Sequence, residues 1–263
     1  MMLALAIATT VRIGVFGLFH PVELEVQPAR AGVLIVETAG HQQRLEGASE
    51  LRLTAAARVT GIDGRDAWFW LSVPGKFRRE FHGLLDVHAH GNRLQAIVEM
   101  DRETAVASIV AAEMPRAPSE AQKAQAVVAR SFLIAARGRH EGFDFCDTTH
   151  CQFLRESPPE ASPARRAQES TRGLALTYQG RVLAALYSAE CGGRTQTLEN
   201  AGWHAEDYPY FAVECPRRGV IAGHRLGMCQ AGAADMARHG KTFREILSLY
   251  FPATSLDDLE PPG

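Results

Sequence analysis

The spacing of hydrophobic and polar positions changes near residue 100. Before that point, apolar residues alternate with polar ones or cluster in short runs rich in β-formers. These runs span residues 11–15, 32–36, 51–59 and 68–73. Two more runs, 84–87 and 94–98, flank Gly91-Asn92, a pair that favours a tight hairpin turn. The first hundred residues are therefore predicted to be β-rich and to contain an antiparallel hairpin.

From Asp101 onward the apolar positions follow a helical period. Asp101 is a favourable N-cap, and the helix that it opens is expected to end before Pro115. A longer, buried helix is predicted from Ser119 to about residue 138, with Ser119 and Gln122 as a capping box. Further helices are expected at 163–173, 231–239 and 242–251, with a hairpin of strands 175–178 and 182–187. Strands and helices mixed without regular alternation indicate an α+β fold.

Composition and charge narrow the possible partners. The chain has 263 residues, 46% of them hydrophobic, and Lys+Arg 28 against Asp+Glu 30 gives a net charge of −2. This balance gives no reason to expect nucleic acid as a partner. No apolar run approaches the roughly 18 residues of a membrane span. The apolar start, which ends in Ala6-Ile7-Ala8, resembles a weak or trimmed export signal.

Glu113 has an unusual position in the last turn of a predicted helix. The C-terminal end of a helix is partially negative, and the neighbouring alanines and Met114 offer little solvation. Both conditions favour the protonated form of a carboxyl, which is the form that a general acid needs. Most glutamates in such positions are simply solvated. Local chemistry therefore leaves two interpretations of Glu113, a general acid or a solvated side chain without a catalytic role.

Two thiols and two imidazoles lie within twelve residues, at His140, Cys146, His150 and Cys151. Four nitrogen and sulfur ligands are what tetrahedral zinc requires. The spacing is not the common zinc-knuckle pattern. A Cys146–Cys151 disulfide or two unpaired thiols are therefore alternatives.

Two glycine-rich segments, 187–195 and 223–230, are candidates for pocket walls because glycine lets the backbone approach a ligand closely. Each is also compatible with a simple tight connection. Cys191 in the first segment is a candidate thiol nucleophile, with His204 or His224 as its base. The chain contains five cysteines, and this odd number excludes a framework in which all are paired.

Several motifs in succession resemble the stage II sporulation protein D family of peptidoglycan lytic transglycosylases. They include AAEMP at 111–115, KAQAVVAR at 123–130 and CDTTHCQ at 146–152. With the later segments 187–195, 223–233 and 243–247, the resemblance covers about residues 80–255. This chain departs from the family at Arg194, Arg225 and Cys229, where the usual residues are His, Gly and Ser, and at Glu190, where a small polar residue is common.

The resemblance implies a domain of about residues 10–255, with a β-rich part at 1–100 and a catalytic part with a metal loop at 101–263. It implies cleavage of the bond between N-acetylmuramic acid and N-acetylglucosamine in peptide-stripped glycan strands, with Glu113 as the single acid/base. Such a substrate places the protein outside the cytoplasm, downstream of an amidase. Non-catalytic glycan binding or amidase enhancement is the alternative function.

The resemblance also assigns further residues to the site. His140, Cys146, His150 and Cys151 are expected to hold one structural zinc ion. The residues expected to contact substrate are Lys123, Arg130, Tyr187, Ser188, Arg194 and Thr195. We expect Arg194 to point toward a sugar subsite and not at Glu113.

Overall fold

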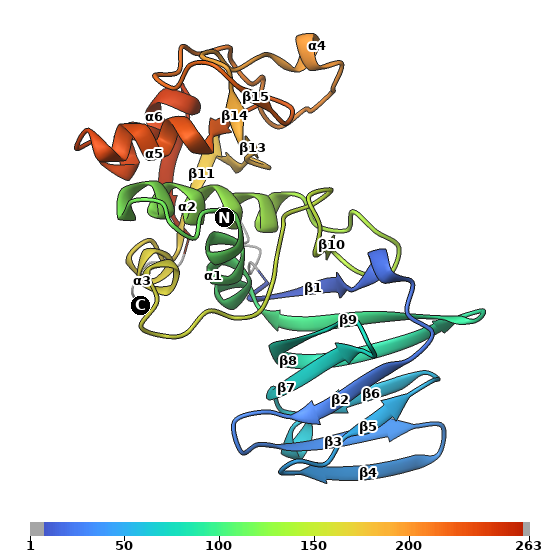
Figure 1. Cartoon of the computed structure of the whole chain (residues 1–263). Helices are drawn as coiled ribbons and strands as arrows, with labels where there is room; N and C mark the ends of the chain where they lie inside the picture. The colour runs from blue at the N-terminus through green and yellow to red at the C-terminus, as the bar shows by residue number, and fades with distance from the viewer. Residues whose placement is uncertain (1–7, 260–263) are drawn as a thin grey trace, which may run out of the picture. The chain divides into compact units, whose positions relative to one another are not determined.

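The computed structural model describes residues 8–259, which fold into two compact units (Figure 1). The first unit contains the chain up to Ser108 together with Arg137–Ser157, and the second contains Ile109–Ala136 and the chain from Pro158. Strands and helices are mixed in sequence, which confirms the predicted α+β class. None of the helices in residues 8–259 has the length and apolar character needed to span a membrane. Most of the expected export signal lies outside the described residues.

A ten-stranded sheet dominates the first unit; Figure 1 shows its strands in blue to green, apart from β10, which is yellow-green. Its strands are β1 (Thr10–Val15), β2 (Leu24–Pro28), β3 (Val33–Thr38), β4 (His41–Glu46), β5 (Leu51–Leu53), β6 (Ala57–Thr60), β7 (Ala67–Val73), β8 (Phe77–His90), β9 (Arg93–Asp101) and β10 (Phe145–Cys146). The order β10-β1-β9-β8-β6-β3-β4 forms one path, from which β7, β2 and β5 branch at β8. Because β8 and β9 pair around Gly91-Asn92, the predicted hairpin is confirmed.

Gly83 lies where the long strand β8 changes partners. Residues 77–83 of β8 pair with β7, whereas residues 85–87 pair with β6. Gly83 has a φ of +148°, and a Cβ atom there would lie 2.1 Å from the carbonyl oxygen of Glu99. Only glycine permits this backbone angle and this close approach.

Helix α1 (Arg102–Glu113) begins as predicted, because the side chain of Asp101 accepts a hydrogen bond of 2.9 Å from the Thr104 amide. The capping box predicted for α2 (Ser119–Ala135) is wrong. Its N-cap position is Pro118, without a side-chain cap. The Gln122 amide is buried and donates instead to the carbonyl oxygen of Met114, 2.9 Å away. The N-cap residue is a proline, which has neither a side-chain acceptor nor an N–H, so no capping box can form.

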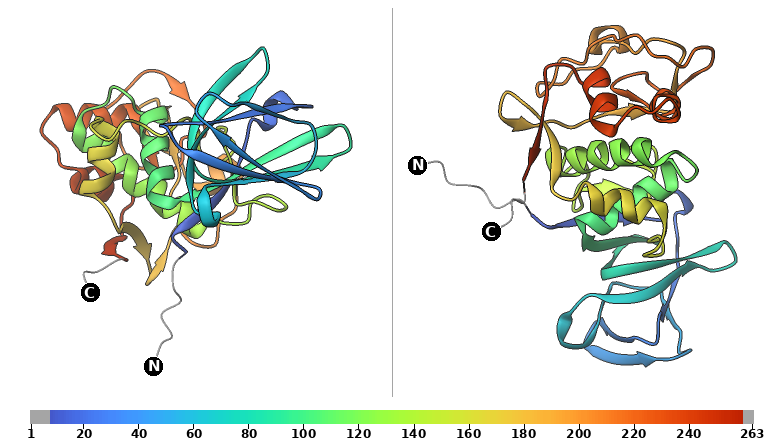
Figure 2. Two further views of the ribbon diagram at one scale, coloured as in Figure 1. Left: turned by 90° about the horizontal axis from the view of Figure 1, so that it is seen from below. Right: turned by 90° about the vertical axis from the view of Figure 1, so that its left-hand side faces the viewer.

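The second unit is built around α2, which in Figures 1 and 2 lies between α3 on one side and α5 and α6 on the other. Its other helices are α3 (Pro163–Ser170), α4 (Leu198–Ala201), α5 (Gln230–Arg238) and α6 (Phe243–Tyr250). Its strands are β11 (Leu174–Tyr178), β12 (Arg181–Val182), β13 (Tyr187–Ser188), β14 (Glu190–Cys191), β15 (Ile221–Ala222), β16 (Met228–Cys229) and β17 (Ser255–Asp258). The capping box of α6 is confirmed, with Thr242 and Glu245 as its members.

The predicted hairpin at residues 175–187 forms only in part. Strands β11 and β12 pair around the Gln179-Gly180 turn as expected. The predicted second strand, however, ends at Val182, and Tyr187–Ser188 forms the separate strand β13, which pairs in parallel with β16. A partner about 40 residues downstream therefore sets the position of Tyr187, and a local turn does not.

Candidate functional site

The carboxyl group of Glu113 is half-buried at the C-terminal end of α1 and is held by side chains from distant parts of the second unit. The Tyr187 hydroxyl donates to Glu113 Oε1 over 3.0 Å. The Gln230 amide donates to Glu113 Oε2 over 3.4 Å. Each carboxyl oxygen thus accepts from at least one side chain, an arrangement that fixes the orientation of the carboxyl.

Tyr187 keeps its proton in this position. Burial, followed by the nearby Glu113 carboxylate, raises the pKa of Tyr187 well above its ordinary value. Its phenol is therefore a hydrogen-bond donor at neutral pH. Pairing of β13 with β16 aligns Tyr187 with Met228 and Ser188 with Cys229, and Gln230 follows directly in the chain. One pair of short strands therefore brings both donors toward Glu113.

Gln125 and Gln230 are neighbours of the site that the sequence analysis did not assign. The Gln230 amide nitrogen lies 3.3 Å from Gln125 Oε1, so it bridges Glu113 and α2. Both glutamines belong to motifs that carry the family resemblance, KAQAVVAR and the segment 223–233. The sequence did offer one signal for Gln230. Its amide can donate and accept hydrogen bonds, and it lies in a glycine-rich segment before a predicted helix.

The structure places the other residues expected around Tyr187 in different settings. Ser188 is buried, and its Oγ has no hydrogen-bond partner among residues 8–259. Thr195 is buried, donates to the Phe211 carbonyl and accepts from the Val213 amide. Arg194 is exposed and forms an ion pair of 3.3 Å with Glu214. A substrate contact for any of these three stays a prediction.

Lys123 and Arg130, both on α2, have structural partners. Lys123 pairs with Glu120, one turn earlier, at 2.6 Å. Arg130 is fully buried and donates to the carbonyl oxygens of Leu174 and Gln168. The two hydrogen bonds of Arg130 connect α2 to Gln168 in α3 and to Leu174 in β11. The predicted substrate contacts of both residues stay untested.

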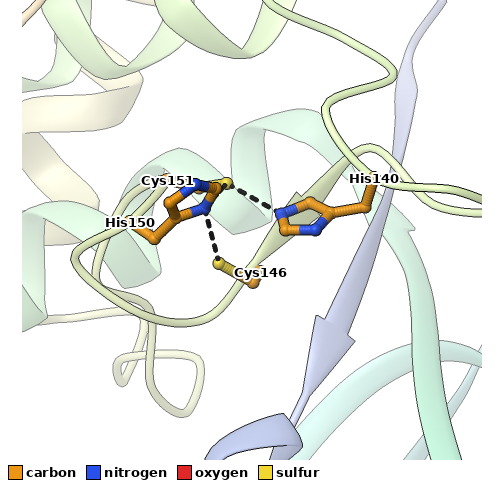
Figure 3. A group of neighbouring side chains, drawn as sticks. All are labelled: His140, Cys146, His150 and Cys151. Carbon is orange, nitrogen blue, oxygen red and sulfur yellow. Dashed lines mark hydrogen bonds between the residues drawn. The ribbon is translucent and has the colours of Figure 1, made fainter.

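The four predicted metal ligands converge in the first unit, as Figure 3 shows. His140 Nε2 lies 3.2 Å from Cys151 Sγ. His150 Nδ1 lies 3.7 Å from Cys146 Sγ and 3.6 Å from Cys151 Sγ. Both cysteines are free thiols, and all four ligand atoms lie within 4.8 Å of one another.

This arrangement fits a tetrahedral zinc ion. Zinc bonds of about 2.3 Å to sulfur and about 2.0 Å to nitrogen place such ligand atoms about 3.6 Å apart. The nitrogen–sulfur separations of 3.2–3.7 Å are close to this value. A hydrogen bond from Cys151 lowers the pKa of Cys146 to about 3 and raises the pKa of Cys151, so one thiolate is available at neutral pH.

Contacts outside the cluster orient its ligands. Strand β10 pairs in parallel with β1, which aligns Cys146 with Gly14. The ring of Phe143 stacks on His140 with centroids 4.5 Å apart. A Cβ atom on Gly14 would lie 2.6 Å from the Phe143 ring. The absence of a side chain at residue 14 therefore makes room for the ring that supports His140.

Asp147 lies in the loop of residues 140–151 and anchors it to the rest of the first unit. Its Oδ2 atom accepts a hydrogen bond from the Phe16 amide and a charge-assisted bond of 2.9 Å from Arg79. Burial raises the pKa of Asp147, although both of these bonds oppose that change. A pocket of about 460 Å³ opens beside the loop, and it is lined in part by His140, Cys146 and His150.

The geometry around Cys191 does not favour a thiol nucleophile. Cys191 is fully buried, and burial raises its pKa, which stabilises the unreactive protonated form. The Nδ1 atom of His224 accepts a hydrogen bond from the Leu226 amide. Cys191 instead lies beside Cys215 and Cys229.

Comparison with known proteins identifies part of the chain. A curated relative, an uncharacterized protein of Brachyspira hyodysenteriae, is 32% identical over 125 residues, which cover 46% of this chain and 34% of the relative. The aligned region thus spans about a third of that protein. Residues 90–178 match the family described as SpoIID, stage II sporulation protein. The match includes Glu113 and the four clustered His and Cys residues, whereas Tyr187 and Gln230 lie beyond it. The resemblance to the SpoIID family is thereby confirmed over residues 90–178, and it supports a role related to the cell wall or to sporulation.

Proposed function

We propose that this protein is a peptidoglycan lytic transglycosylase that acts on glycan strands without stem peptides. The SpoIID match supports a cell-wall substrate. The observation that carries the proposal is the hydrogen bond from Tyr187 to the half-buried Glu113 carboxyl. A catalytic carboxyl must be both oriented and accessible, and Glu113 meets both conditions.

One carboxyl group is enough for this reaction. A glycoside hydrolase uses two, one as the acid and the other as nucleophile or base. In a lytic transglycosylase the 6-hydroxyl of the muramic acid is the internal nucleophile. Glu113 would protonate the leaving glycosidic oxygen and then accept the proton of the 6-hydroxyl as that oxygen attacks C1, which yields a 1,6-anhydro end. Tyr187 and Gln230 would hold the carboxyl in position during both steps.

The cluster of His140, Cys146, His150 and Cys151 would hold one structural zinc ion. Four protein ligands fill a tetrahedral site and leave no position for a reactive water molecule. Zinc would therefore fix the loop that contains residues 140–151, and it would have no part in proton transfer. The charge-assisted bond from Arg79 to Asp147 would hold the same loop together with the ion.

Cleavage of peptidoglycan implies action outside the cytoplasm. Strands without stem peptides are products of an amidase, so an amidase that removes these peptides would supply the substrate. Removal of the stem peptides leaves a free lactyl carboxylate on each muramic acid, so the strand is anionic, and the small net charge of −2 opposes its binding only weakly.

The decisive experiment incubates the full chain with purified peptide-free glycan strands and identifies the products by mass spectrometry. The proposal predicts fragments with 1,6-anhydromuramic ends. Reducing ends would indicate hydrolysis, and bound but intact strands would favour the non-catalytic glycan-binding or amidase-enhancing role. The exposed Glu199→Gln variant is a matched control, because it removes a surface carboxyl from the same unit.

A further inference from the structure

Three cysteines outside the first cluster meet in the interior of the second unit. Cys191 ends β14, Cys215 lies in the loop before β15, and Cys229 ends β16. Their exposed fractions are 0%, 3% and 0%. The amide of Cys215 donates to the Gly193 carbonyl over 2.9 Å, which ties this loop to the turn after β14. Three separate segments thus deliver one thiol each to the same buried point.

The sulfur atoms are arranged as the ligands of a single ion would be. All three are free thiols within 4.8 Å of one another. Sulfur atoms that share a zinc ion at about 2.3 Å lie about 3.8–4.0 Å apart. Closing the cluster around an ion thus needs shifts of at most about 1 Å. A disulfide would use two of these thiols and leave the third without a role.

Two of the sulfur atoms have polar partners on the helices packed around the cluster. The Gly232 amide, in the first turn of α5, donates to Cys229 Sγ over 3.3 Å. The positive end of the α5 dipole therefore faces this sulfur. Cys215 Sγ lies 3.1 Å from the Tyr250 hydroxyl.

We propose that Cys191, Cys215 and Cys229 form a second metal site that binds a soft d¹⁰ ion such as Zn²⁺ through three thiolates. The Tyr250 hydroxyl is the candidate fourth ligand, because it is already adjacent to Cys215. Three protons leave when the ion binds, so the site has a net charge of −1 with a neutral phenol. The amide of Gly232 and the α5 dipole offset this charge.

Gly232 leaves space for the side chains that surround the cluster. A Cβ atom on Gly232 would lie 2.4 Å from Cys215 Sγ and 2.1 Å from the Tyr250 hydroxyl oxygen. Only glycine at position 232 leaves room for the Cys215 thiol and the Tyr250 hydroxyl to lie together at the cluster. The ion would cross-link β14, the Cys215 loop and β16, and Gln230, which contacts Glu113, directly follows Cys229. Only this bracing effect rests on the proposed function, because metal binding by the three thiols is independent of it.

The test measures metal bound per chain with the first cluster disabled. In a Cys146→Ser/Cys151→Ser background, purified without chelator and dialysed with Zn²⁺, elemental analysis should find about one equivalent. Adding Cys229→Ser should reduce the content to near zero. This variant should still fold, because a serine hydroxyl caps a helix N-terminus at least as well as a thiol. Circular dichroism of the metal-free proteins provides the folding control.

A second measurement covers the case in which the background variant fails to fold. The unmodified chain loaded with ¹¹³Cd²⁺ should give two NMR resonances, one from each cluster, and Cys229→Ser should remove only one. Tyr250→Phe should weaken binding at the three-cysteine site. Unchanged affinity would reject Tyr250 as the fourth ligand.

Two results would overturn the second metal site. One is a chain that binds metal only at the first cluster while Cys191, Cys215 and Cys229 all react with an alkylating agent after denaturation. These thiols would then be inert core residues. The other is a mass spectrum that shows a disulfide between two of them in freshly purified protein.

Discussion

Tyr187 donates a hydrogen bond to Glu113 over 3.0 Å, although 74 residues separate them in the chain. The bond requires β13 to pair with β16, because this pairing determines where Tyr187 lies. The high pKa of the buried phenol means that the bond persists at neutral pH. Glu113 is therefore held by a donor that remains protonated throughout the physiological range.

Replacing the carboxyl tests the acid/base assignment directly. Glu113→Gln keeps the shape of the side chain but removes the transferable proton. The rate of release of anhydromuramic products should fall on the order of 10²- to 10⁴-fold. Binding to glycan strands, measured by co-sedimentation, should persist. Release at the unmodified rate would show that Glu113 is not the acid/base.

Tyr187→Phe tests the positioning role of the phenol. It removes one hydrogen bond to a charged group, which contributes about 1.5–3 kcal/mol, so kcat should fall roughly tenfold to a hundredfold. KM should change little, because Tyr187 acts through Glu113. A variant in which only KM rises would place Tyr187 in substrate binding instead.

If the first cluster holds the proposed zinc ion, removal of one ligand should release the ion and destabilise the first unit. Cys146→Ser should lower the zinc content by one equivalent and lower Tm, because metal at a thousandfold excess over Kd contributes about 4 kcal/mol. Binding requires deprotonated thiols, so zinc affinity should fall as pH falls. A chelator that leaves the Tm of the unmodified chain unchanged would contradict a structural metal.

Gly14→Ala tests the support of His140 without altering a ligand. The new methyl group would collide with the Phe143 ring that stacks on His140. Zinc affinity should fall roughly 10- to 100-fold, as is common when residues that orient a ligand are changed. Gly17→Ala is the matched control, because no atom lies within 4 Å of a Cβ at that position. If the two variants bind zinc with equal affinity, the stacking of Phe143 on His140 does not contribute to metal binding.

Arg194→His tests the departure from the family pattern. Arg194 pairs with Glu214, and both side chains are mostly exposed, at 61% and 70%. Exposed ion pairs contribute little to stability, so Tm should stay within about 1–2 °C. We expect kcat to be preserved and the apparent affinity for peptide-free strands to change. A loss of kcat with unchanged affinity would link Arg194 to the chemistry of Glu113.

The sequence by itself determined the features that depend on neighbouring residues. The Gly91-Asn92 turn, the Asp101 cap and the capping box of α6 follow from local backbone geometry and short-range hydrogen bonds. The first Cys and His cluster also falls within twelve residues, so its ligands were visible as a group. The limits of local reasoning appear at the start of α2, where the helix begins one residue earlier than predicted, so Pro118 takes the N-cap position and no capping box forms.

Only the tertiary structure decided which distant residues meet. Tyr187 and Gln230 reach Glu113 because short strands pair across about 40 residues, and no local pattern specifies this register. The three buried thiols meet for the same reason, since Cys191 ends β14, Cys229 ends β16 and Cys215 lies in the loop before β15. Long-range pairing depends on the free energy of the whole core, so spacing in the sequence predicts each residue type but not its partners.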